Sequence, residues 1–192
     1  MEKKVLRKSV NSVIGISPHG EFVAIKIVQE EENLQKMVMN VMDGKMEKPG
    51  FVMMIGLPGS GKSYFSNIYS NNLKNMGIPN IILSSDKIRK ELYGDESIQD
   101  DPDKVFQIME ERTINNLKNN ISVVYDATNI NYKNRMNLLK KLPDCWKIAL
   151  IIWTPYQMCL ERNKNRERIV PENAIKKMYK KNRKNQLKNK GG

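Results

Sequence analysis

The sequence is poor in the residues that build metal and disulfide sites. Its 192 residues include one histidine, His19, and two cysteines, Cys145 and Cys159, which form no CxxC spacing. This set indicates no zinc site. Both cysteines lie within or beside apolar segments, so we expect them to pack as small hydrophobic side chains in a reducing compartment. His19 follows Pro18 in a turn-like segment and is expected to be an exposed loop residue.

Long apolar runs are also missing. No stretch reaches the roughly 18 apolar residues expected of a membrane span. The first ten residues, MEKKVLRKSV, have no apolar core after their basic side chains, so they do not fit a signal peptide. We therefore expect a cytoplasmic location and no membrane partner.

Acidic residues are scarce at one end of the chain. The formal net charge is +12, and residues 161–192, with twelve basic and three acidic side chains, carry +9 of it. Such an excess is typical of proteins with polyanionic partners, nucleic acid among them. A solvated, lysine-rich terminal helix that keeps the protein soluble explains it equally well.

The first 49 residues predict a small extension of unknown role. Residues 12–17 and 21–28 flank a turn and suit two antiparallel strands, and residues 30–43 have helical apolar spacing. Two glycines and a proline then interrupt both periodicities over residues 44–50. We expect a hairpin and helix up to residue 49, and a second domain over residues 50–192.

Short apolar runs alternate with amphipathic stretches from residue 51 onward. The runs lack strict polar alternation and predict strands buried on both faces, at residues 51–55, 81–83, 121–125 and 148–153. Helices are expected at residues 62–75, 85–93, 102–119, 131–141 and 155–163, and a last one from Pro171 to about Lys188. This order predicts an α/β fold with a parallel sheet covered by helices on both faces.

The strongest motif is GLPGSGKS, residues 56–63, which fits GxxxxGK[ST] and stands between a predicted strand and a predicted helix. Its backbone N–H groups and the helix N-terminus suit a phosphate chain. Lys62 would bridge the β- and γ-phosphates of ATP, and the Ser63 hydroxyl would ligate Mg²⁺. The nucleotide-binding residues expected here are Gly56, Gly59, Ser60, Gly61, Lys62, Ser63 and Tyr64.

Polar residues follow the next two predicted strands. Asp86 would lie at the carboxyl edge of the sheet, where a carboxylate can accept a proton from an attacking hydroxyl. Arg89, three residues later, shares a helix face with it and could hold an anionic part of the acceptor. Asp126 ends the third strand and could support Mg²⁺ waters or orient Arg89. Helix capping is the alternative for Asp86, and for Thr128 and Asn129 beyond the third strand.

Three arginines, Arg162, Arg166 and Arg168, precede Val170 and Pro171. Proline disfavours helix in the preceding residue, which predicts a loop near residues 162–170. A mobile basic loop over the phosphates can neutralise charge in the transition state and exclude water. A solvated basic helix end is the alternative.

With GLPGSGKS, SDKIR, DATN and RNKNRERIVPE in this order, residues 50–185 resemble the P-loop kinase domain of polynucleotide 5′-hydroxyl kinases of phage and bacteria. The resemblance implies an adenylate-kinase-like fold and ATP-dependent transfer of the γ-phosphate to a 5′-hydroxyl of DNA or RNA. It also implies that Asp86 is the general base and that Arg89 contacts the acceptor's phosphate. Lys62, Ser63 and Asp126 would serve phosphate and metal, and Arg162 and Arg166 the donor phosphates.

Two other functions fit the same residues. The loop, the strand-end aspartate and the lid arginines also occur in kinases of small molecules and in toxins that phosphorylate nucleotide sugars. A nucleotide-gated module that binds nucleic acid without turnover would explain the basic terminus. The motifs indicate phosphoryl transfer to a hydroxyl more sharply than they indicate which hydroxyl, and the oligomeric state is left open.

Overall fold

The computed structural model of the chain describes residues 5–9, 12–16, 22–27, 48–98 and 100–188. The helix predicted at residues 30–43 and the turn around His19 lie outside the described residues.

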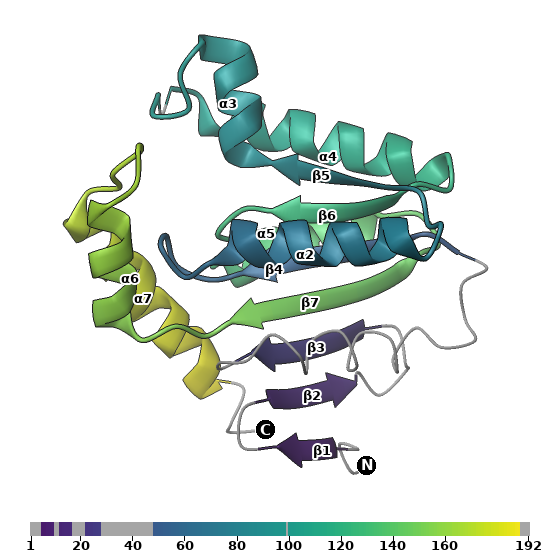
Figure 1. Ribbon diagram of the computed structural model, residues 1–192, viewed down its shortest axis with the longest axis horizontal. Helices are drawn as coiled ribbons and strands as arrows, with labels where there is room; N and C mark the ends of the chain where they lie inside the picture. The colour runs from purple at the N-terminus through teal and green to yellow at the C-terminus, as the bar shows by residue number, and fades with distance from the viewer. Residues whose placement is uncertain (1–4, 10–11, 17–21, 28–47, 99, 189–192) are drawn as a thin grey trace.

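The described strands form one sheet in the order β1-β2-β3-β7-β4-β6-β5 (Figure 1). Their bounds are β1 Val5–Ser9, β2 Ser12–Ile16, β3 Phe22–Ile27, β4 Gly50–Ile55, β5 Asn80–Ser84, β6 Ser122–Asp126 and β7 Trp146–Ile152. The neighbours from β3 to β5 pair in parallel. The phosphate-loop strand β4 is therefore central, and its carboxyl end lies between those of β6 and β7.

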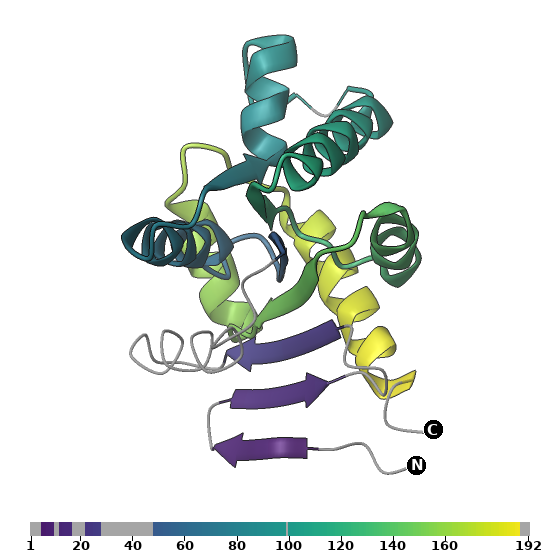
Figure 2. The ribbon, with the colours of Figure 1, turned by 90° about the vertical axis from the view of Figure 1, so that its right-hand side faces the viewer.

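Helices cover both faces of this sheet, as the sequence predicts. Figure 2 shows α2 and α6 on one side of the strands, and α4, α5 and α7 on the other. The helix bounds are α2 Lys62–Asn75, α3 Ser85–Tyr93, α4 Pro102–Lys118, α5 Tyr132–Lys141, α6 Tyr156–Lys164 and α7 Glu172–Lys188. The fold is the predicted P-loop kinase fold of the adenylate-kinase-like type.

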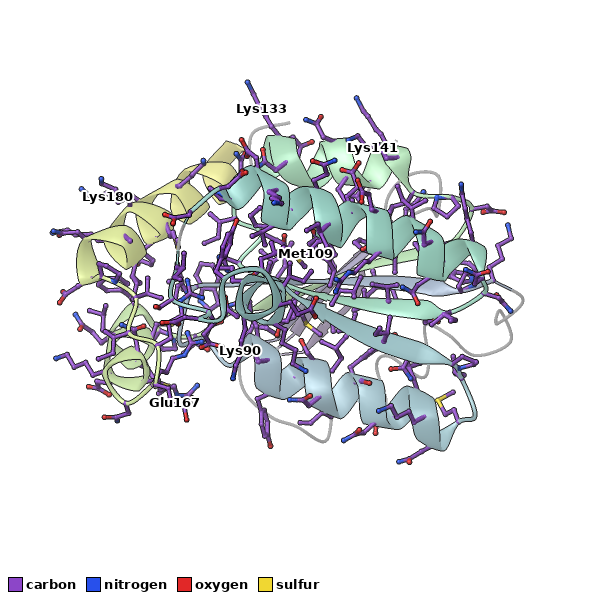
Figure 3. All side chains as sticks on the ribbon, turned by 90° about the horizontal axis from the view of Figure 1, so that it is seen from above. Lys90, Met109, Lys133, Lys141, Glu167 and Lys180 are labelled. Carbon is purple, nitrogen blue, oxygen red and sulfur yellow. The ribbon has the colours of Figure 1, made fainter. Side chains whose placement is uncertain are left out.

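The apolar run of β4 explains the two-sided core. Val52 and Met54 pack with Tyr69 and Leu73 of α2. Phe51, Met53 and Ile55 alternate with them and join a cluster with residues of α3, α4 and α5 on the opposite face. Because successive strand side chains point to opposite faces, a continuous apolar run fits a strand covered on both sides. In Figure 3 Met109 of α4 lies in this interior, and Lys133, Lys141 and Lys180 lie at the outer surface.

The prediction that residues 81–83 are buried on both faces is wrong. β5 is the edge strand beside β6, and its Ile81 side chain is 38% exposed. Leu83 is the buried apolar residue of this strand. An edge strand lacks a neighbour on one side, which a short apolar run in the sequence does not reveal.

The predicted N-terminal hairpin is confirmed by the antiparallel pairing of β2 with β3. This hairpin continues the main sheet, because β3 pairs in parallel with β7. The strand β1, which the sequence did not suggest, pairs with β2 at the sheet edge. The division of the chain at residue 49 stays a prediction.

Cys145 and Cys159 are both unpaired and buried, as predicted. Burial raises the pKa of each thiol, to about 11 for Cys145. Within the described residues, no helix combines the length and the apolar character needed to cross a bilayer.

Candidate active site

The loop between β4 and α2 is held in place from two sides. The backbone N–H of Gly56 donates to the Thr128 carbonyl oxygen at 3.1 Å, which ties the loop to the end of β6. The Thr154 hydroxyl donates to the Ser60 carbonyl oxygen at 2.8 Å, which ties it to the segment after β7. These hydrogen bonds fix the loop at the carboxyl edge of the sheet, where α2 begins at Lys62.

Gly59 is the position in this loop that tolerates no side chain. Its φ is +77°, and a Cβ there would lie 2.3 Å from the Cys159 carbonyl oxygen in α6. Both the left-handed backbone and the close approach of α6 require glycine. The loop glycines therefore serve helix packing as well as phosphate access.

Gly59→Ala is expected to destabilise the protein by about 2–4 kcal/mol and to abolish nucleotide binding, since strain and a backbone clash add. Gly77→Ala is the matched control, because Gly77 has φ +74° and nothing within 4 Å of a Cβ. That variant should lose about 1 kcal/mol, from backbone strain alone. Urea unfolding and a nucleotide titration compare the two, and equal losses would contradict the close packing of Gly59.

A cavity of about 680 Å³ opens between this loop, α3, the end of β6 and the segment after α6. Ten of the predicted site residues line it: Gly59, Gly61, Lys62, Ser63, Tyr64, Asp86, Arg89, Asp126, Arg162 and Arg166. Gly56 and Ser60 lie in the loop behind the lining. The structure thus brings residues more than 100 positions apart around one cavity.

Lys62 is buried at the floor of this cavity. Its Nζ donates to the Leu57 carbonyl oxygen at 2.7 Å. Burial lowers its pKa to about 8, against the opposing effect of the Asp126 carboxylate. The negative charge of a bound triphosphate would stabilise the protonated form of the buried Lys62 side chain.

The lowered pKa of Lys62 predicts that nucleotide affinity depends on pH. Binding requires the protonated ammonium, so affinity should be constant below the pKa and fall as pH rises through about 8. We expect nucleotide to bind about tenfold more weakly at pH 9 than at pH 7, the effect of one coupled proton. The other charges and titrating groups that act on Lys62 are Asp126, Arg166, Asp86 and Cys159.

Calorimetric titration at pH 7, 8 and 9, with Lys62→Met as the control, tests this dependence. The variant should bind weakly and with no tenfold step between pH 7 and pH 9. A step of the same size in Lys62→Met would assign the titration to another group.

Asp126 and Ser63 form the oxygen-rich corner of the cavity. Asp126 is buried, and burial raises the pKa of its carboxyl group, partly offset by a hydrogen bond from Ser63 and by the charge of Lys62. A hydroxyl and a carboxylate oxygen are hard ligands of the kind that Mg²⁺ accepts beside water and phosphate. These two residues fit a magnesium ion. Asp126 pairs here with Ser63, and Arg89 pairs with Asp86 instead.

Asp86, in the first turn of α3, is surrounded by arginines. Arg89 donates to its Oδ1 at 2.9 Å, and Arg168 donates to the same oxygen. The Arg166 guanidinium lies 3.8 Å from Oδ2. Both carboxylate oxygens therefore face cations, and one negative charge meets three positive ones.

This arginine cluster is short of negative charge. Arg89 is buried, and its Nε has no hydrogen-bond partner. Burial and then the neighbouring Arg168 lower the pKa of the Arg89 guanidinium, which Asp86 opposes. Anionic groups of a ligand would relieve both the repulsion and the unpaired donor.

The predicted lid is a short loop closed at its base. Arg162 lies in the last turn of α6, and Arg166 and Arg168 lie in the segment before α7. The buried Asn163 joins the ends of this loop, since its Nδ2 donates to the Val170 carbonyl oxygen and its Oδ1 accepts from the Val170 N–H. These two hydrogen bonds fix the base of the loop that carries Arg166 and Arg168.

The sequence places Arg168 in the basic loop over the donor phosphates, but the predicted site residues include only Arg162 and Arg166 from that loop. The contact of Arg168 with Asp86 depends on how the loop crosses the cavity, and its only sequence signal is the RxR spacing with Arg166. Phe106 and Met178 also line the cavity. Phe106 could have been suspected because it falls one position outside the α4 core stripe of Val105 and Met109.

Comparison with known proteins identifies the family of this chain. A family model described as an AAA domain, AAA_33, matches residues 51–184. The chain belongs to this AAA domain family. The match spans the phosphate loop, Asp86, Asp126 and the lid arginines of this AAA domain.

A curated relative of the AAA domain is an L-seryl-tRNA(Sec) kinase from Methanococcus maripaludis. It is 32% identical over an alignment of 138 residues, and the match covers 68% of this chain and 51% of the relative. The chain thus spans about half the length of that relative.

Solved structures share the fold of the AAA domain. A chain in the Pnkp1/Rnl/Hen1 RNA repair complex has a TM-score of 0.64 and 20% identity, over 76% of this chain and 48% of that one. An APS kinase from Mycobacterium tuberculosis, in complex with AMPPNP and APS, has a TM-score of 0.51 and 20% identity, over 60% of this chain and 69% of that one.

Proposed function

We propose that this protein transfers the γ-phosphate of ATP to the 5′-hydroxyl of a polynucleotide. The observation that carries the proposal is Asp86, which shares one cavity with the phosphate loop and with the lid arginines. A base and a triphosphate cradle in one cavity suit attack of a hydroxyl on a γ-phosphoryl group.

In the reaction, the Asp86 carboxylate accepts the proton of the acceptor hydroxyl. The hydroxyl oxygen bonds to the γ-phosphorus as the bond to the β–γ bridging oxygen breaks, and ADP leaves. Lys62 and Arg162, on the loop side of the cavity, stabilise charge on the transferring group. Ser63 and Asp126 would hold Mg²⁺, which neutralises phosphate charge when bound.

The arginines around Asp86 give the reaction an order. Both carboxylate oxygens of Asp86 contact arginine side chains. A triphosphate carries enough negative charge to draw Arg166 and Arg168 away from Asp86, which frees the base. ATP therefore binds first, and the acceptor hydroxyl then meets an unblocked carboxylate.

A polynucleotide acceptor is supported by the basic end of the chain. Exposed lysines of α7, including Lys176, Lys177 and Lys180, follow the lid directly. The four ordered motifs that resemble polynucleotide kinases support the same acceptor. Nucleic-acid binding through these lysines should weaken steeply as salt rises, which a small neutral acceptor would not show.

A second candidate acceptor is the seryl hydroxyl of an aminoacylated tRNA. The observation that favours it is the 32% identity to an L-seryl-tRNA(Sec) kinase. Both acceptors present a hydroxyl beside a nucleoside, and both carry a polyanionic chain.

An acceptor panel separates these possibilities. Labelled ATP is incubated with 5′-hydroxyl DNA and RNA oligonucleotides, seryl-tRNA, nucleosides and small sugar acids. The proposal expects the highest kcat/KM with a 5′-hydroxyl oligonucleotide. Transfer to seryl-tRNA alone would replace it with the second candidate, and transfer to small molecules alone would reject both.

A further inference from the structure

A second cavity of about 530 Å³ lies behind the first, between α4, α5 and α7. Figure 2 shows these three helices together on one side of the sheet. The two cavities share three lining residues, Phe106, Thr128 and Met178. The second cavity is thus adjacent to the proposed active site.

Phe106 stands at the junction of the two cavities. Its side chain is 37% exposed, although its neighbour Val105 is fully buried in the core. Among the exposed large apolar side chains of the described residues, Phe106 borders both cavities. Tyr64 and Ile169 border one cavity, and the others border neither. An exposed aromatic ring at such a place is suited to stack on a flat ligand.

Two of the three cations that line the second cavity already have partners in the structure. Lys141 is paired with Glu110 at 2.7 Å. The Arg135 guanidinium donates to the backbone oxygens of Asn129 and Ile130, at 2.7 and 3.0 Å, and stacks on a tyrosine ring. With Lys181 as the third cation and two carboxylates, Asp103 and Glu110, in its lining, the second cavity carries a formal net charge of only +1.

Amide side chains face the second cavity instead. Asn134 and Asn137 project from one face of α5, three residues apart. Gln107 of α4 also lines the cavity, and its Nε2 donates to a Glu111 carboxylate oxygen at 3.0 Å. Amides offer donors and acceptors to an uncharged ligand, as they do to the edges of nucleobases. The ring of Phe106 and the amide side chains of the second cavity together suit a nucleobase, which has a flat face and a polar edge.

The ligand at Phe106 belongs to the acceptor and not to ATP. Phe106 projects from α4, which packs beside α3, the helix that carries Asp86. The triphosphate cradle and Arg162 lie on the loop side, where a Cβ on Gly61 would be 3.8 Å from an Arg162 Nη1. Phe106 therefore lies in the same cavity as Asp86, on a helix that packs against the helix of this proposed base.

We propose that Phe106 stacks on the nucleobase of the reacting nucleotide, with the base edge turned toward the amides of the second cavity. This inference rests on the proposed function and specifies how its acceptor is recognised. Phe106 is a binding residue for the acceptor, and it leaves ATP untouched.

The test compares two 5′-hydroxyl oligonucleotides, one with a normal 5′-terminal base and one with an abasic 5′-terminal residue. Phe106→Ala should raise KM for the normal acceptor by about 10–100-fold, as expected for loss of one base–aromatic stack. Its KM for ATP should not change. The abasic acceptor should have a high KM with the wild-type protein, and Phe106→Ala should raise it no further.

Two variants complete the test. Phe106→Trp keeps a ring and should retain a low KM, which separates stacking from a folding defect. Ile81→Ala removes a side chain of similar exposure, 38%, on β5 and outside both cavities, and should change nothing. An equal effect of Phe106→Ala on both acceptors, or none on either, would overturn the inference while transfer itself persists. Absence of transfer by the wild-type protein would overturn the proposed function and this inference with it.

Discussion

Asp86→Asn is expected to lower kcat for phosphate transfer by about 10²–10⁴-fold, the usual contribution of a general base. Asparagine has nearly the same shape and can still accept a hydrogen bond from Arg89, but it cannot take a proton from the acceptor. The loss should therefore appear in kcat, with a small change in KM for the acceptor.

The same variant should bind ATP at least as tightly as the wild-type protein. Arg166 and Arg168 face the Asp86 carboxylate, which would compete with a bound triphosphate for these two arginines. Asparagine removes the negative charge that competes with the triphosphate. Calorimetry on both proteins measures this, and a marked loss of ATP affinity in Asp86→Asn would contradict the proposed order of events.

Asp144→Asn is the matched control for Asp86→Asn. Asp144 is an exposed carboxylate that pairs with Lys48 and lines neither cavity. Its amide should leave kcat and ATP affinity unchanged. Near wild-type transfer by Asp86→Asn would show that another group is the base.

Arg166→Ala is expected to lower kcat by about 10³-fold, within the range known for arginines that stabilise a transferring phosphoryl group. The Arg166 side chain is 34% exposed and lies beside Asp86, so its removal does not disturb the core. The loss comes from charge that develops on the γ-phosphoryl group in the transition state. Initial rates at saturating ATP and acceptor measure it.

Two further variants interpret that loss. Arg166→Lys keeps the charge without the planar fork and should recover part of the rate. Arg112→Ala removes an arginine of similar exposure, 44%, which pairs with Glu91 outside the cavity, and should leave the rate within about twofold. A wild-type rate in Arg166→Ala would show that Arg166 does not stabilise the transferring phosphoryl group.

The fold and the nucleotide side of the site could be predicted because their signals are local. The phosphate loop fixes a strand before it and a helix after it, and α2 begins at Lys62 and α3 at Ser85, as predicted. Successive side chains of β4 point to opposite faces of the sheet and all are apolar. This short apolar run therefore predicts a strand covered by helices on both faces. The edge position of β5 does not follow, because strand order depends on contacts between distant segments.

The positions of Arg168 and Phe106 at the site could not be predicted for the same reason. Arg168 and Asp86 are 82 positions apart, and their contact depends on the path of the lid over the cavity. In the sequence, Phe106 is one apolar residue of an amphipathic helix. Its position beside a cavity depends on α5 and α7, which are distant in the sequence. Resemblance to polynucleotide kinases supplied roles for Asp86 and Arg89, but nothing for these two residues.

The central claim is tested most directly by the site of labelling on one RNA oligonucleotide. The protein is incubated with γ-labelled ATP and with the same oligonucleotide bearing either a 5′-hydroxyl or a 5′-phosphate. The account predicts label at the 5′-terminus of the first and none on the second. Equal labelling of both, or label on neither while ATP is consumed on a small hydroxyl compound, would contradict it.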